Sequence, residues 1–84
     1  MSIDPLVKRF IQLDEEYRSA VFMLKTSHQE RAEGQSIDEV LAQNERILEW
    51  MDMLQRTIRN LASSPEGNMA YIEALRRRVA KNRD

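Results

Sequence analysis

The side chains in this sequence that could take part in chemistry are a run of carboxylates, one histidine and a cluster of arginines. Asp14, Glu15 and Glu16 are adjacent. On a helix, residues one or two apart point in different directions, so these carboxylates cannot readily chelate one ion. The chain has no cysteine, which excludes disulfides and thiolate metal ligands. Motifs such as H-E-x-x-H and G-x-S-x-G are absent. We therefore expect a protein that is not an enzyme and that uses no cofactor, metal or small-molecule substrate.

The single histidine, His28, allows two interpretations. A metal ligand or a general base needs further converging groups, and the sequence places no carboxylate beside this histidine. The structural alternative is a polar layer with Ser27 and Asn44, because an antiparallel hairpin places Asn44 level with both residues. An asparagine inside a helix seam needs a hydrogen-bond partner, and a shifted register leaves it without one. We favour the structural interpretation, in which Ser27, His28 and Asn44 fix the register.

The arginine cluster lies close to the end of the sequence, where Lys81 and Arg83 follow Arg76, Arg77 and Arg78. Such a cluster can hold phosphates, with an affinity that falls as salt rises. No aromatic residue interleaves with the arginines, as stacking on single strands requires. Arginines also complement the negative pole at the C-terminus of a helix. Contact of Arg76, Arg77, Arg78 and Lys81 with nucleic acid or with an acidic partner is therefore the alternative function.

Composition bounds the class of protein. With 84 residues, 42% hydrophobic and 32% charged, the chain is expected to form one folded domain, residues 1–84. Two glycines and two prolines favour a few long helices over many short strands. A net charge of −1 gives no general attraction to nucleic acid or anionic membranes. No apolar run approaches the about 20 residues that cross a bilayer, and no secretory signal is recognisable. We expect a cytoplasmic protein with no membrane association.

Three helices are predicted from apolar spacing and from start and stop signals. Asp4-Pro5 begins the first, and Gly34 ends it, so that it covers about residues 5–33. Ser36-Ile37-Asp38-Glu39 matches a capping box and begins the second, about residues 37–62. It stops before Ser63-Ser64-Pro65, because the position before proline disfavours helix.

The third helix is predicted over about residues 66–81, starting at Ser64-Pro65-Glu66, with Gly67 weakening this start signal. Its apolar stripe, with which it is expected to cover one flank of the other two helices, is Met69, Ile72, Leu75 and Val79. A membrane-surface role has little support, because this helix is short and its apolar face is narrow.

The short connection between the first two helices makes them antiparallel neighbours joined by a coiled-coil seam. The predicted fold is therefore all-α, a long antiparallel helical hairpin plus a short third helix. The third helix packs in its own chain or across a dimer.

More apolar residues are present than this seam and one covering helix can bury. A homodimeric helical bundle is the expected way to cover the rest. The residues that we expect to meet another protein are Phe22, Met23, Trp50 and Met53. The alternative places Trp50 in the core, where it would fill space left by Ala20. The function predicted from this surplus is a protein–protein interaction module, such as an adaptor, inhibitor or chaperone-like regulator.

Overall fold

The computed structural model describes residues 2–29 and 36–82, and these residues form three α-helices. They are α1 (Asp4–Gln29), α2 (Ile37–Leu61) and α3 (Pro65–Asn82). The predicted all-α hairpin with a third helix is confirmed. The predicted bounds of α2 and α3 agree with the structure within one residue. The predicted end of the first helix and the stop at Gly34 lie outside the described residues.

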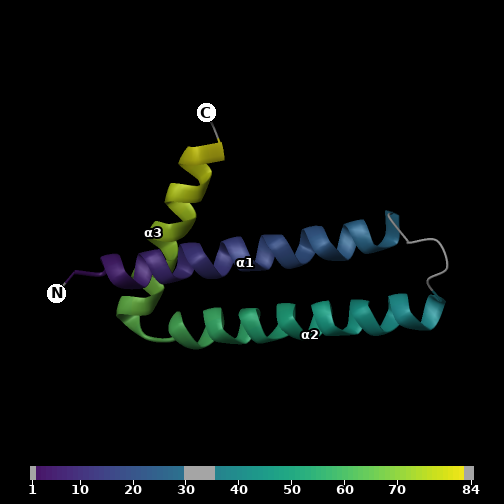
Figure 1. The fold of residues 1–84 in the computed structure, drawn as a ribbon. Coiled ribbons are helices and arrows are strands. Elements are labelled where there is room, and N and C mark those ends of the chain that lie inside the picture. Colours follow the sequence, from purple (N-terminus) through teal and green to yellow (C-terminus); the bar gives the residue numbers. More distant parts are fainter. Residues whose placement is uncertain (1, 30–35, 83–84) are drawn as a thin grey trace.

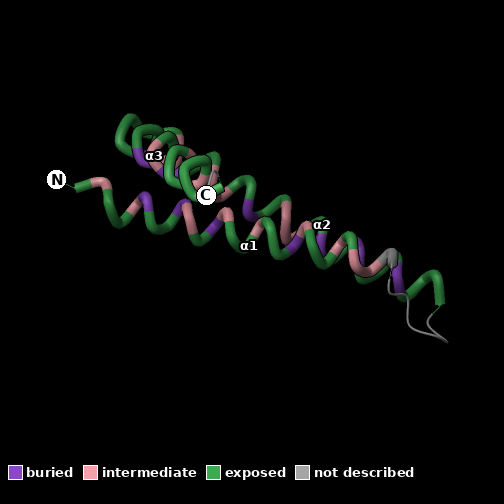
Figure 2. Tube along the Cα trace, turned by 90° about the horizontal axis from the view of Figure 1, so that it is seen from above, coloured by how far each residue is buried: buried purple, intermediate pink, exposed green. Residues whose placement is uncertain are grey.

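The hairpin and α3 are arranged as two layers. Helices α1 and α2 run antiparallel, side by side along most of their lengths. Helix α3 crosses α1 steeply, near the N-terminal end of α1 (Figure 1). Viewed at right angles, α3 lies on one face of the hairpin only (Figure 2). The Cα atoms span 54 × 31 × 13 Å. Most of the hairpin towards the α1–α2 connection is therefore not covered by α3.

Side-chain caps define the starts of α2 and α3. The Ser36 hydroxyl oxygen accepts a hydrogen bond of 3.2 Å from the Glu39 N–H, which is the serine half of the predicted capping box. At α3 the Ser64 hydroxyl oxygen accepts from the Gly67 N–H at 2.9 Å. Each bond satisfies a backbone donor that the first turn of a helix leaves without a partner.

Gly67 does not weaken the start of α3, as the sequence had suggested, but is required there. The residue is buried, and a Cβ added to it would overlap the carbonyl oxygen of Leu61 at the end of α2. Because the chain turns from α2 into α3 within a few residues, the two helix ends approach each other at backbone distance. Only glycine, which has no side chain, fits this approach.

The core has two parts. Where α3 crosses α1, Val7 and Phe10 form a buried cluster with Ala70 and Ala74, and the rings of Phe10 and Tyr71 meet edge to face with centroids 5.5 Å apart. Along the hairpin, the buried apolar residues are Leu13, Ala20, Val40, Ile47 and Leu54. The cluster at the crossing holds α3 in place, so it also decides which face of α3 remains outside.

The predicted packing face of α3 is wrong. Instead of its large apolar residues, α3 buries three small ones, Gly67, Ala70 and Ala74. Small side chains allow the axes of crossing helices to approach closely, which favours this face at a steep crossing. The stripe predicted to pack is exposed at Met69 (60%), Ile72 (48%) and Val79 (47%), and only Leu75 is partly buried.

Candidate functional site

Among the described side chains, two hydrogen bonds join α1 to α2 at the expected register. Near the α1–α2 connection the Ser27 hydroxyl lies 2.7 Å from Asn44 Oδ1, and Asn44 is only 6% exposed. Further along, Gln55 Nε2 donates to the Tyr17 hydroxyl at 3.1 Å. The structure thus brings together two members of the predicted polar layer. The side chain of the third, His28, lies outside the described part of the chain.

The orientation of the Asn44 amide follows from the number of hydrogens available. The Ser27 hydroxyl also lies 2.9 Å from the Leu24 carbonyl oxygen, yet it carries one hydrogen and cannot donate fully to both oxygens. Turning the amide by half a rotation places Asn44 Nδ2 towards Ser27. The amide then donates to Ser27, and Ser27 donates to Leu24. Both contacts are satisfied in this arrangement, which suits a structural role in the seam.

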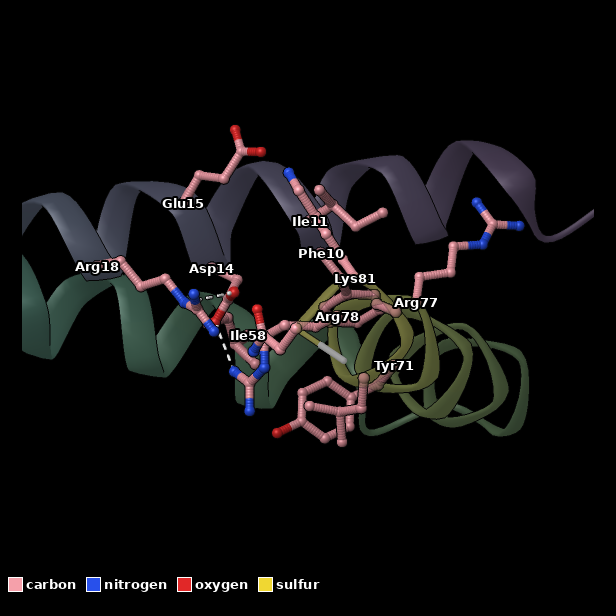
Figure 3. A pocket seen from close by; sticks show the side chains of 13 residues that line it. Phe10, Ile11, Asp14, Glu15, Arg18, Ile58, Tyr71, Arg77, Arg78 and Lys81 are labelled. Carbon is pink, nitrogen blue, oxygen red and sulfur yellow. Dashed lines mark hydrogen bonds and ion pairs between the residues drawn. The ribbon is translucent and has the colours of Figure 1, made fainter. Parts of the chain in front are cut away.

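Asp14 pairs with two arginines, and one of them, Arg78, joins α3 to α1. Its Oδ1 accepts from Arg78 Nη1 at 3.0 Å, and its Oδ2 lies 3.2 Å from Arg18 Nε (Figure 3). Arg78 and Asp14 are far apart in the sequence, so this contact exists only because α3 crosses α1. The carboxylate run therefore supplies a structural ion pair at Asp14.

Arg76 and Arg77, two of the other predicted basic residues, also lie beside carboxylates of their own chain. Arg77 lies 3.4 Å from Glu73 and 3.9 Å from Asp4, while Arg76 lies 3.9 Å from Glu73. Lys81 is exposed. Exposed pairs of this kind contribute little to stability, about 0–1 kcal/mol each. A phosphate would nevertheless have to compete with these carboxylates for Arg77 and Arg78.

A crevice of about 210 Å³ lies between α1 and α3 (Figure 3). Phe10, Ile11 and Ile58 line it on its apolar side, and Arg78 and Lys81 line its charged side. No sequence pattern indicates this crevice, because its walls meet only through the crossing of α3. Sites for small molecules usually measure about 300–1,000 Å³. The crevice is smaller than this range and forms the edge of the α1–α3 contact.

The predicted protein-binding residues do not form one compact patch. Trp50 is partly buried and lines a shallow hollow with residues of α1 that include Glu16 and Ser19. Met23 follows Ser19 by four residues and Met53 follows Trp50 by three, so both lie along the same flank of the hairpin. Met23 and Met53 are exposed there.

Among the described residues, Phe22 is the most exposed large apolar one, with 67% of its surface accessible. It lies beside Met23 in the sequence, which turns it about 100° away around the helix. Phe22 is therefore on a different side of α1 from the flank that holds Met23, Trp50 and Met53.

A surface that the sequence analysis did not expect is the exposed side of α3, which we call the α3 stripe: Met69, Ile72, Leu75 and Val79. A shallow apolar hollow runs along it, lined by Ile72, Leu75 and Val79 together with the neighbouring Arg76 and Ala80. The sequence did hold a signal for it. Small residues recur at Gly67, Ala70 and Ala74, spaced three and four, and so form a second stripe on the opposite side of the helix.

Two further findings concern membranes and metals. Within residues 2–29 and 36–82, no helix combines the length and apolar character needed to cross a bilayer. In the same residues, no group of three or more histidine, aspartate or glutamate side chains is placed to hold a metal ion. Comparison with known proteins found no matching family model, no matching curated protein and no matching solved structure.

Proposed function

We propose that this protein is a cytoplasmic, non-enzymatic protein–protein interaction module that acts as an adaptor, inhibitor or chaperone-like regulator. The observation that supports it is the α3 stripe. Helix α3 buries alanines and directs larger apolar side chains to solvent at Met69, Ile72 and Val79. Single exposed apolar residues are common on proteins, whereas a continuous apolar stripe marks a surface that another molecule covers.

The form of the stripe suits a protein partner. Its side chains recur at spacings of three and four along one helix, as do the anchors of helices that bind in protein grooves. Met69 adds a flexible, polarisable side chain, which adapts to different partner surfaces. The flank with Met23, Trp50 and Met53 offers a second contact surface, since tryptophan is common among the residues that dominate binding energy.

The test is capture of partner proteins from a native lysate after nuclease treatment, with tagged native protein and tagged variants. The double variant Ile72→Ser/Val79→Ser should lose the captured partner while keeping the helical circular dichroism of the native protein, because both residues are exposed. Asn68→Ser, at an exposed polar position of α3, is the matched control and should retain the partner. Capture that is unchanged by the double variant would contradict a role for the stripe.

The second surface is tested with Trp50→Ala and Met53→Ala in the same capture. Loss of the partner with little change in stability supports a contact role for this flank. A loss of several kcal/mol in stability with capture intact would place both residues in the core and remove them from the proposed surface.

A dimeric hairpin that binds RNA or DNA through Arg76, Arg77, Arg78 and Lys81 is the alternative. One observation favours it: the Arg76 side chain is 78% exposed and lies at the long distance of 3.9 Å from Glu73. This alternative predicts that nucleic acid is retained in the capture without nuclease, and that added salt or Arg76→Ala weakens its retention. Retention that does not depend on salt would contradict it.

A further inference from the structure

We propose that the α3 stripe is covered by a second copy of this chain. In this arrangement the stripe of each copy packs on an uncovered apolar strip of the other copy's hairpin. This inference rests on the proposed function, because it names a partner for the same surface. The contact is two-fold symmetric, so that α3 of each copy packs on the hairpin of the other copy.

The strip on the hairpin, which we call the hairpin strip, consists of Val21, Leu41, Leu48 and Met51. Leu41 and Leu48 are exposed, while Val21 and Met51 are partly buried. On α2, Leu48 and Leu41 precede Gln55 by seven and fourteen residues and so lie on the same face as Gln55. Gln55 lines a hollow together with Arg78 of α3. The hairpin strip therefore lies on the same face of the hairpin as α3, but beyond the part of this face that α3 covers.

The α1 side of the hairpin strip is placed by the same reasoning. Val21 follows Asp14 by seven residues, and Asp14 bonds Arg78 of α3 at 3.0 Å. Val21 therefore lies on the same face of α1 as Asp14, the face that α3 contacts.

At about 1.5 Å per residue, α2 is about 38 Å long. Because α3 crosses only at the far end from the α1–α2 connection (Figure 1), the part of this face that carries the hairpin strip stays open.

Two copies related by a two-fold axis would cover the α3 stripe and the hairpin strip of both copies. With the two hairpins antiparallel and face to face, each α3 lies between its own hairpin and the open half of the other hairpin. Such a contact is isologous, and it leaves neither the α3 stripe nor the hairpin strip free to bind further copies. The reciprocal contact is larger than the α3 stripe alone could form, because each copy contributes both its stripe and its strip.

One pair of opposite charges, Arg76 and Glu45, lies at the edges of the two surfaces. Arg76 follows Ile72 by four residues and Met69 by seven, so it lies within the α3 stripe, where its side chain is 78% exposed. Glu45 follows Leu41 by four and precedes Leu48 by three, so it borders the hairpin strip. Opposite charges at the edges of two apolar patches favour this pairing over like-with-like contact.

The experiment is a charge exchange, read as molecular mass by sedimentation equilibrium. The native chain should be a dimer at micromolar concentration. Arg76→Glu and Glu45→Arg should each weaken self-association at least about tenfold, since like charges then meet at both contacts of the dimer. An equimolar mixture of the two variants should restore the dimer, because one contact pairs the two substituted side chains and the other keeps the native pair.

Arg46→Glu is the matched control. It changes the charge by the same amount as Arg76→Glu, and one residue beyond Glu45 it points to a different side of α2. The control should remain dimeric, and all variants should keep the native helical circular dichroism.

Two results would overturn this proposal. If the native chain stays monomeric at high micromolar concentration, the second copy is not the partner. Capture of another protein through Ile72 and Val79 would in that case still support the proposed function. If the native chain is dimeric but the two variants fail to form a dimer when mixed, or if each remains dimeric alone, the contact between α3 and the hairpin is wrong.

Discussion

Replacing Gly67 with alanine tests the close approach of α2 and α3. In an exposed helix this change stabilises by up to about 1 kcal/mol, because alanine is the better helix former. Here the new Cβ would overlap the Leu61 carbonyl oxygen. A backbone oxygen cannot turn aside as a flexible side chain can, so α3 must move away from the end of α2.

Movement of α3 also disturbs the cluster that Ala70 and Ala74 form with Val7 and Phe10. Overpacking of this kind costs about 1–3 kcal/mol. Overlap with a backbone atom places the cost in the upper part of this range, about 2–3 kcal/mol. Subtracting the helix-forming gain of about 1 kcal/mol leaves an expected net destabilisation of about 1–2 kcal/mol. For a domain of this size, each kcal/mol lowers the melting temperature by about 4–8 °C.

The assay is thermal and urea unfolding followed by circular dichroism at a fixed protein concentration, since any self-association would make stability depend on concentration. The control is Ala80→Gly at an exposed position of α3, which reports helix propensity alone. A Gly67→Ala variant as stable as the native protein, or more stable, would show that the two helix ends do not approach as described.

Two further substitutions test the core and the seam. Phe10→Ala should destabilise the protein by about 3–5 kcal/mol in urea unfolding, because it leaves a cavity where α3 crosses α1. A change below about 1 kcal/mol would contradict the packing of Phe10 against Tyr71. Ser27→Ala and Asn44→Ala, alone and combined, should give a coupling energy of about 0.5–1.5 kcal/mol in a double-mutant cycle. Additive effects of these two substitutions would mean that their hydrogen bond does not form in solution.

The sequence by itself determined the helices and the hairpin. The signals for the helices act over a single turn, so local chemistry is sufficient to place the helices in the sequence. These signals are the apolar spacings of three and four, the serine at position 36 and the prolines near the starts of α1 and α3. The register also followed from local information, because a short connection leaves few ways to align two antiparallel helices. Asn44 then met Ser27 as the spacing predicts.

The tertiary structure alone decided which side of α3 packs. By the amount of apolar surface that could be buried, the side of α3 with Met69 and Ile72 is expected to pack on the hairpin in preference to the side with Ala70 and Ala74. A steep crossing over α1 instead rewards small side chains that let the helix axes approach. The pairing of Arg78 with Asp14 has the same origin, since no local rule relates residues so far apart in the chain. The α3 stripe is exposed for this reason, because packing geometry rather than hydrophobicity chose the buried face.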